Sequence, residues 1–110
     1  MVISLSSDNA YKYFKEEGFV VSARTKKRKR PFCKTWLNRG RGKKKVCDVN
    51  VAYITKIYRY TQEGLSTMRN FAPFTGLYHL REWFNEIIEL NGLESKKEIP
   101  EVLYLYLISQ

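Results

Sequence analysis

Residues 45–60 read KVCDVNVAYITKIYRY, and their apolar and polar side chains alternate up to Tyr53. A period of two is typical of a β-strand, because successive side chains point to opposite faces of the sheet. One face carries Cys47, Val49, Val51 and Tyr53, and the other carries Val46, Asp48 and Asn50. We therefore expect a long strand from Lys45 that continues, with a bend or bulge, toward Tyr60.

The chain before this strand predicts one helix and one further strand. Residues 8–17 follow the helix-capping residue types at 6–8 and precede Gly18, which favours a short helix. Residues 19–23 are β-branched or aromatic, so we expect a buried strand that ends at Arg24.

The chain after the long strand predicts a second helix and a closing strand. Residues 61–68 are polar and are expected to form a turn or a single helical turn. Thr75 is a capping residue type, and apolar side chains recur at helical spacing over residues 77–90. Residues 102–108 are rich in Leu and Tyr and indicate a central strand with both faces covered. Together these segments predict an α+β fold, a small mixed β-barrel flanked by two helices.

The positive charge of the chain is concentrated in residues 24–45. This segment holds twelve of the twenty Lys and Arg residues and contains no Asp or Glu. Because Pro and Gly residues interrupt it, we expect a long exposed loop or a β-hairpin arm. Such a segment on an otherwise nearly neutral chain is typical of proteins that bind a polyanion, most commonly the phosphate backbone of nucleic acid.

Candidate nucleic-acid-binding residues follow from this basic arm. Arg24 stands at a strand end, where a guanidinium can hold a phosphate, while Trp36 and Phe32 are flat groups able to stack on unpaired bases. The predicted binding set is Arg24, Lys26, Lys27, Arg28, Lys29, Arg30, Lys34, Trp36, Arg39, Arg41, Lys43 and Lys44. Two other interpretations stay open, a solvated basic loop and a nuclear-import signal at residues 27–31.

Length and composition exclude several protein classes. A chain of 110 residues fits one domain, 1–110, and no apolar run approaches the roughly 20 residues that span a bilayer. Residues 1–7 lack the pattern of a secretory signal, so we expect an intracellular (cytoplasmic) protein without a membrane partner. Cys33, Cys47 and His79 are too few for a four-ligand zinc site, and we expect two thiols rather than a disulfide. No metal or cofactor is predicted.

Three short motifs resemble those of a known family. Residues 18–24, GFVVSAR, are similar to the early strand of the ASCH domain, a small β-barrel related to the RNA-binding PUA fold. The resemblance continues through residues 38–44, NRGRGKK, and through residues 74–76, FTG, which precede a helix with Glu82 and Trp83 and a Tyr-rich strand. It covers the chain from about Gly18 to Ile108.

The resemblance implies a PUA-like barrel with a cleft at Ser22 and Arg24, and RNA rather than DNA as the preferred partner. Some ASCH proteins are ribonucleases or hydrolyse acetylated cytidine, with a Lys three residues before a hydroxyl and a Glu near the later helix. Ser22 matches the hydroxyl, but Phe19 stands at the Lys position and residues 69–81 contain no carboxylate. We therefore expect an RNA-binding domain rather than an enzyme. A nucleoside or RNA hydrolase using Ser22, and a protein-interaction module that docks on an acidic partner, remain the alternatives.

Overall fold

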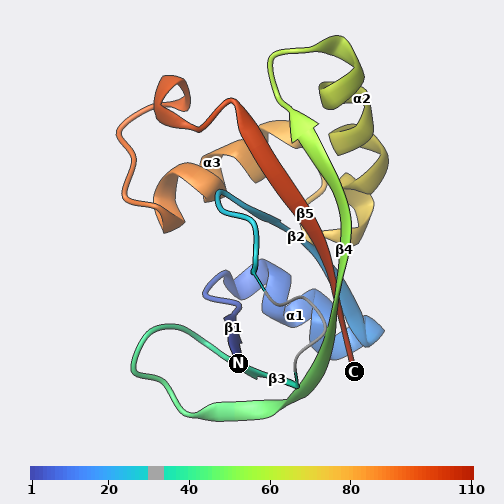
Figure 1. Cartoon of the computed structure of the whole chain (residues 1–110), viewed down its shortest axis with the longest axis vertical. Coiled ribbons are helices and arrows are strands. Elements are labelled where there is room, and N and C mark those ends of the chain that lie inside the picture. Colours follow the sequence, from blue (N-terminus) through green and yellow to red (C-terminus); the bar gives the residue numbers. More distant parts are fainter. Residues whose placement is uncertain (30–33) are drawn as a thin grey trace.

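The longest strand, β4 (Lys45–Tyr58), organises the sheet in the computed structural model, which describes residues 1–29 and 34–110 (Figure 1). The first part of β4 pairs antiparallel with β3 (Thr35–Asn38), and the remainder pairs antiparallel with β5 (Val102–Ser109). β1 (Val2–Ser4) adds to β3 in parallel, and β2 (Phe19–Arg24) adds to β5 antiparallel. The strand order is therefore β1-β3-β4-β5-β2.

The alternation predicted for β4 is confirmed in its first half. Val49 and Val51 are buried, whereas Asp48, which precedes Val49, and Asn50, which lies between the two valines, are exposed. The expected bend is a register shift against β5 between Tyr53 and Thr55, which reverses the alternation beyond that point. Both faces of β5 are covered as predicted, because Leu103, Leu105, Tyr106 and Ile108 are all fully buried.

The described strands form an open mixed sheet, and the closed barrel expected from the sequence is wrong for this part of the chain. β1 and β2 are the two edges, and no ladder joins them within residues 1–29 and 34–110. β1 has only three residues before the chain turns toward the first helix, so it offers too little strand to pair with β2. In the part of the chain that the structure describes, a side-chain hydrogen bond links the two edges: the Arg24 guanidinium Nη2 donates to the Ser4 carbonyl oxygen at 2.8 Å.

Three α-helices, rather than the expected two, occur in the described residues. α1 (Asp8–Glu17) has the predicted bounds: the Ser7 hydroxyl accepts from the Ala10 N–H at its start, and Gly18 ends it at φ +83°. The polar turn predicted at 61–68 is wrong, because this segment belongs to α2 (Gln62–Phe71). The Thr61 hydroxyl accepts from the Gly64 N–H at 2.9 Å and so caps α2. The sequence did not predict this cap, because Gly64 was interpreted as part of a turn.

α3 (Leu80–Leu90) begins three residues later than predicted. The Thr75 hydroxyl donates to the Ala72 carbonyl and accepts from the Leu77 N–H, so it closes the turn after the 3-10 helix η1 (Ala72–Phe74) instead of capping α3. A second 3-10 helix, η2 (Lys96–Glu98), precedes β5.

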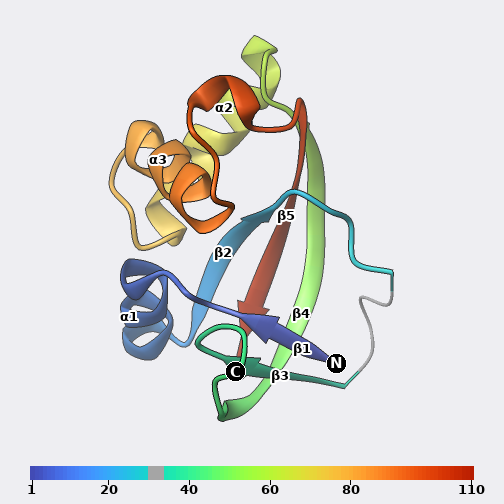
Figure 2. The same cartoon turned by 90° about the vertical axis from the view of Figure 1, so that its left-hand side faces the viewer.

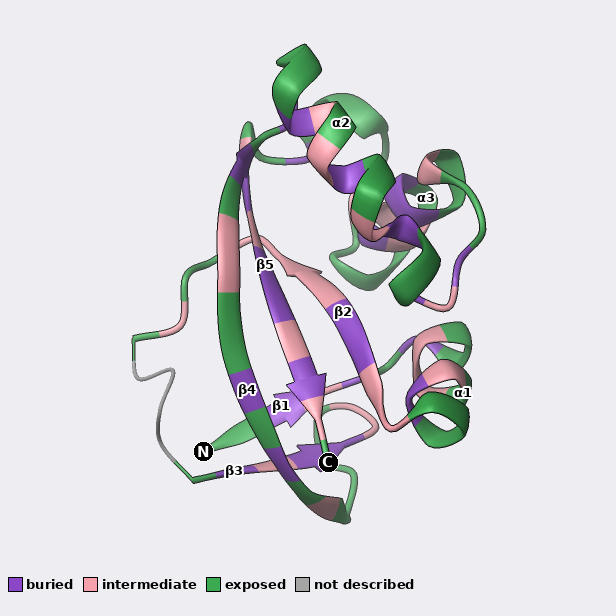
Figure 3. Ribbon diagram, turned by 90° about the vertical axis from the view of Figure 1, so that its right-hand side faces the viewer, coloured by how far each residue is buried: buried purple, intermediate pink, exposed green. Residues whose placement is uncertain are grey.

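The helices divide the core into two clusters on opposite faces of the sheet. α2 and α3 cover one face of β4, β5 and β2, as Figure 2 shows. α1, β1 and β3 enclose the second cluster against the other face, near the start of β4. Figure 3 shows the resulting pattern, with β5 largely buried and β4 exposed over much of its length.

Two forms were predicted for the basic arm at residues 24–45: one long loop is wrong for the described residues, whereas a hairpin is present in part, because β3 pairs antiparallel with the start of β4. β3 lies inside the arm and is a paired strand, so the cations fall into two separate loops at the two ends of β3. The first loop includes residues 25–29, and the second, residues 39–44, is the hairpin turn between β3 and β4. Among the described residues, the helices are all too short or too polar to cross a membrane.

Candidate functional site

A pocket of about 360 Å³ lies at the unpaired edge of β2, between the start of α1 and α3. One wall is the segment from Ser4 to Ser7, and the second wall is the end of β2 with the loop that follows it. The third wall consists of Thr75, Leu77 and apolar side chains of α3. We call this the arginine pocket, because Arg24 and Arg28 both line it.

The two guanidinium groups are incompletely paired. Arg24 donates from Nη2 to the Ser4 carbonyl, but its Nε is buried without a hydrogen-bond partner. Arg28 has a 3.4 Å contact from Nη1 to the Val2 carbonyl oxygen, and its Nε and Nη2 are buried without partners. Neither arginine has a carboxylate within ion-pair distance in the described part of the chain. Buried donors without acceptors are costly, so this arrangement needs an explanation.

The environment of Arg24 disfavours its positive charge. Burial, and after it the neighbouring charge of Arg28, lower the pKa of the Arg24 guanidinium to about 10, while Tyr106 acts in the opposite direction. The side chain still carries its proton at neutral pH. An anion in the pocket would supply both the missing acceptors and the missing negative charge.

Hydroxyl groups and the N-terminus of α1 also line the pocket, where the Ser4 and Thr75 hydroxyls already donate to Asn38 Oδ1 and to the Ala72 carbonyl. Ser4, Ser6, Ser7, Ser22, Thr25 and Thr75 all line it. Ser7 is occupied in capping α1, whose positive dipole end therefore lies at the pocket wall. Gly76 approaches α1 so closely that a Cβ would lie 2.4 Å from the Asn9 carbonyl oxygen, and this contact holds the Thr75 turn against the helix.

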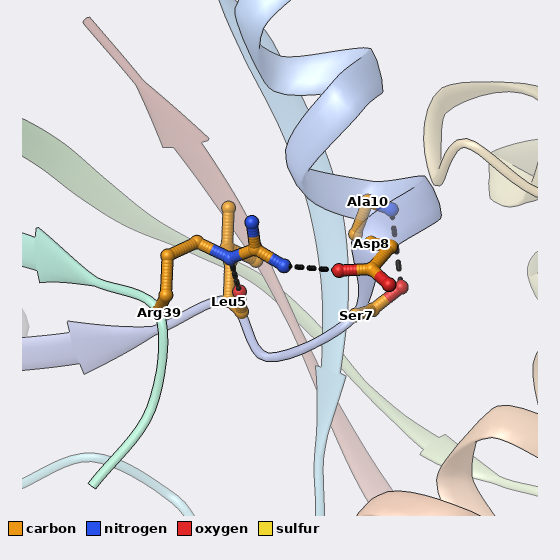
Figure 4. Close-up of polar contacts among 5 residues, drawn as sticks. All are labelled: Leu5, Ser7, Asp8, Ala10 and Arg39. Carbon is orange, nitrogen blue, oxygen red and sulfur yellow. Dashed lines mark hydrogen bonds and ion pairs between the residues drawn. The ribbon is translucent and has the colours of Figure 1, made fainter. Parts of the chain in front are cut away.

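Arg39 fixes the segment between β1 and α1, as Figure 4 shows. Its Nη2 pairs with the Asp8 carboxylate at 2.5 Å, and its Nε donates to the Leu5 carbonyl at 2.9 Å. The guanidinium also lies 4.2 Å from the centre of the Tyr11 ring. The sequence predicted a mobile phosphate contact at this position, whereas the structure engages Arg39 in positioning the Ser4–Ser7 wall.

The structure brings together four of the residues predicted from the sequence: Ser22, Arg24, Lys26 and Arg28 line the same pocket. Lys27 turns away from it and lies over the Tyr53 ring at 5.0 Å. Exposed positions elsewhere are held by Lys29, Lys34, Arg41, Lys43 and Lys44. Trp36 is half-buried on β3, where its backbone N–H donates to the Met1 carbonyl. Arg30, Phe32 and Cys33, with the expectation for the Cys33 thiol, lie outside the described residues.

Sequence reasoning assigned Glu86 to the solvated face of its helix, but Glu86 is the one carboxylate among the described residues that line the pocket. The sequence analysis looked for a carboxylate over residues 69–81, before α3 begins. Glu86 lies three residues after Trp83 and directly before Ile87, which both line the pocket. Because side chains three apart share a helix face, the burial of Trp83 was the signal that would have placed Glu86 there.

Comparison of the chain with protein families, with curated proteins and with solved structures finds no match. In the described residues, His, Cys, Asp and Glu side chains form no group of three that could hold a metal ion.

Proposed function

We propose that the chain is a nucleic-acid-binding domain, with RNA as its preferred partner, that holds a phosphate group in the arginine pocket. The observation that carries this proposal is the pair of partly buried guanidinium groups, Arg24 and Arg28, whose unpaired N–H groups share one pocket. Nucleic-acid phosphates are abundant anions that accept several hydrogen bonds at once, and guanidinium groups bind them in a forked geometry.

The distribution of charge supports a polymer rather than an isolated anion. Lys26 lines the pocket, and Lys27 and Lys29 flank it on the same loop. The second loop carries the exposed cations Arg41, Lys43 and Lys44. Gly40 of this loop lies beside Ser6 of the pocket wall, so the positive surface extends from the pocket to the loop. These mobile side chains suit phosphates on either side of the one in the pocket, and such contacts carry affinity but no sequence information.

The preference for RNA rests on the resemblance to the ASCH domain, since charge alone does not distinguish RNA from DNA. We propose that the domain is an open-sheet relative of the PUA-like barrels. In support of this, the pocket lies at the end of β2, where the resemblance implies a cleft that contains Ser22 and Arg24.

A hydrolase that uses Ser22 is the second candidate, because Ser22 and Glu86 line the same pocket. A carboxylate beside a hydroxyl is one requirement for activating a nucleophile. The family's amine is missing at Phe19, whose ring packs against Tyr13 and Phe74. Among the described residues that line the pocket, Lys26 is the amine nearest to Phe19 in the sequence. We therefore rank binding above hydrolysis.

Binding of an unrelated single-stranded RNA, followed by fluorescence anisotropy at several salt concentrations, tests the proposal. The logarithm of the affinity should fall with the logarithm of the salt concentration by roughly 0.7 to 0.9 per phosphate neutralised, and by several units in total. Arg24→Met and Arg28→Met should weaken binding, whereas Arg69→Met, at an exposed position of α2, is the matched control. Binding that ignores salt, or that Arg24→Met leaves intact, would reject the proposal. Loss of RNA binding with retained binding of an acidic protein would favour the protein-interaction alternative.

A further inference from the structure

One face of the sheet near the end of β4 is not covered by the helices. Leu103 and Leu105 pack toward α2 and α3, so Tyr104 between them points to the opposite side. Lys56 pairs with Tyr104 across β4 and β5, and directly opposed residues of an antiparallel pair share a face. Tyr58 shares it as well, two residues further along β4. In Figure 2, α2 and α3 lie on one side of β4 and β5, and the loop after β2 passes on the other.

Exposed aromatic rings dominate this face. Tyr53 is 37% exposed and Tyr58 is 45% exposed, while Tyr104 is half-buried between them. Tyr53 meets the buried Tyr106 of the opposed strand edge-to-face, with ring centres 5.6 Å apart, which fixes its position. We call Tyr53, Tyr58 and Tyr104, with Lys27 and Lys56, the tyrosine face.

Cations lie among these rings without acidic neighbours. The Lys27 ammonium is 5.0 Å from the centre of the Tyr53 ring, and that of Lys56 is 5.1 Å from the centre of the Tyr58 ring. A hydrogen bond with Tyr58 is the main cause that raises the pKa of Lys56 above its usual value, and Tyr104 and Tyr53 add to it. Residues 53–58 and 102–106 contain no carboxylate. The face therefore favours a partner that is both aromatic and anionic.

The tyrosine face is continuous with the arginine pocket through residues 26–28. Lys26 and Arg28 line the pocket, whereas Lys27 between them lies over Tyr53. The Arg28 N–H donates to the Tyr106 hydroxyl at 2.7 Å, which holds this loop against the sheet. A chain that places one phosphate in the pocket can therefore cross the loop and reach the rings.

We propose that the tyrosine face stacks unpaired bases of a single-stranded RNA whose phosphate occupies the arginine pocket. This inference rests on the proposed function and narrows its partner to single strands. Bases within a duplex are already stacked on one another, so only unpaired bases can lie on protein rings. Tyr53 and Tyr58 are five residues apart on β4, roughly 16 Å at about 3.3 Å per residue, which leaves room for each ring to take its own base.

The test compares an oligouridylate with the same strand annealed to oligoadenylate, by fluorescence anisotropy. The variant with both Tyr53→Leu and Tyr58→Leu should bind the single strand about 5- to 100-fold more weakly for each stacked base lost, and bind the duplex within twofold of the unchanged protein. Tyr58→Phe keeps the ring and should retain affinity. Tyr78→Leu, at a residue that is 88% exposed and outside this face, is the matched control.

The outcomes separate this inference from the proposed function. Equal losses on strand and duplex, or no loss in a variant that melts normally, would overturn the inference while Arg24→Met still weakens both substrates. No binding of either substrate by the unchanged protein would overturn both. Should the double variant fail to fold, Tyr58→Leu alone decides, because Tyr58 is the more exposed of the two rings.

Discussion

Arg59 and Arg24 are both withdrawn from solvent, but the chain surrounds them in opposite ways. Arg59 is 3% exposed, and its Nε donates to the carbonyls of Ile99 and Pro100 at 3.0 and 3.2 Å. Its Nη2 donates to the Lys96 carbonyl at 2.9 Å and contacts the Tyr60 hydroxyl, and its guanidinium stacks 3.8 Å from the Tyr60 ring centre. Arg24 has one acceptor, the Ser4 carbonyl, and another arginine beside it.

The difference separates an arginine that stabilises the fold from one that costs stability. The acceptors around Arg59 tie the end of β4 to the segment before β5, and none of its nitrogens is buried without a partner in the described residues. The pocket around Arg24 and Arg28 concentrates positive charge, and neither arginine forms an ion pair in the described chain, although Glu86 also lines the pocket. Groups that a fold leaves unsatisfied are found most often at functional sites, where a ligand supplies what the protein lacks.

The largest expected effect is on stability at Arg59. Arg59→Met should lower the free energy of unfolding by about 3 kcal/mol or more, because it removes the guanidinium hydrogen bonds to three backbone carbonyls of residues 96–100. Urea unfolding followed by circular dichroism measures this change. Arg59→Lys should recover only part of the loss, since an ammonium cannot reproduce the fork. RNA affinity of the folded fraction should stay unchanged; a loss of affinity would place Arg59 in the binding surface and break the contrast.

The opposite outcome is expected at Arg24. Arg24→Met should weaken RNA binding by about 10- to 100-fold, the value of a charged hydrogen bond, and change the free energy of unfolding by less than about 1 kcal/mol. Anisotropy and urea unfolding of the same preparation give both numbers. Strong destabilisation with normal affinity in the folded fraction would make Arg24 a structural residue like Arg59.

Local patterns predicted the parts of the fold that depend on neighbouring residues. The alternation in β4 and the capping and glycine stop of α1 are written in consecutive residues, and both are confirmed. β1 and β3 have three and four residues, and they become strands only through pairs such as Val2 with Trp36. No period is readable in segments that short, which is why the sequence did not distinguish between one loop and a hairpin arm for the cationic segment.

The same limit applies to the site. Arg24 was predicted from its position at the end of a predictable strand, and Ser22 only from the resemblance to the ASCH domain. The serines before α1 and Glu86 on α3 reach the pocket only through packing between distant segments. The sequence also did not predict that Arg24, Arg39 and Arg59 have different roles. The role of an arginine depends on the hydrogen-bond acceptors that the fold places around its guanidinium.

Raising the pH tests the contrast between Arg24 and Arg59, because the lowered pKa of Arg24 predicts the direction in which the free energy of unfolding changes with pH. The pKa of the Arg24 guanidinium is about 10 in the folded protein and higher, at its ordinary value, in the unfolded chain. Below pH 10 the group is charged in both states, and the folded state bears the full cost. Between the folded and the unfolded pKa the unfolded state binds more protons, so the free energy of unfolding rises with pH.

Comparison with Arg24→Met isolates this contribution from other titrating groups. Relative to Arg24→Met, the unchanged protein should gain about 1 kcal/mol between pH 8 and pH 11, a figure that allows for solvent screening of a half-buried side chain. Urea unfolding at the two pH values measures it. Parallel curves for the two proteins would mean that Arg24 is not held in an unfavourable environment.

The smallest expected effect is at Ser22, which lines the same pocket as Arg24 and decides between binding and hydrolysis. A serine hydroxyl is a weak nucleophile at neutral pH unless a base or cation activates it, and Phe19 offers neither. Ser22→Ala should therefore leave RNA affinity within about twofold, because one neutral hydrogen bond contributes little beside two guanidinium groups. The unchanged protein should release no acetate from acetylated cytidine above the background rate. Turnover that disappears in both Ser22→Ala and Glu86→Gln would favour the hydrolase over the binding domain. The guanidinium groups of the pocket would then stabilise an oxyanion formed in the reaction rather than bind a phosphate of RNA.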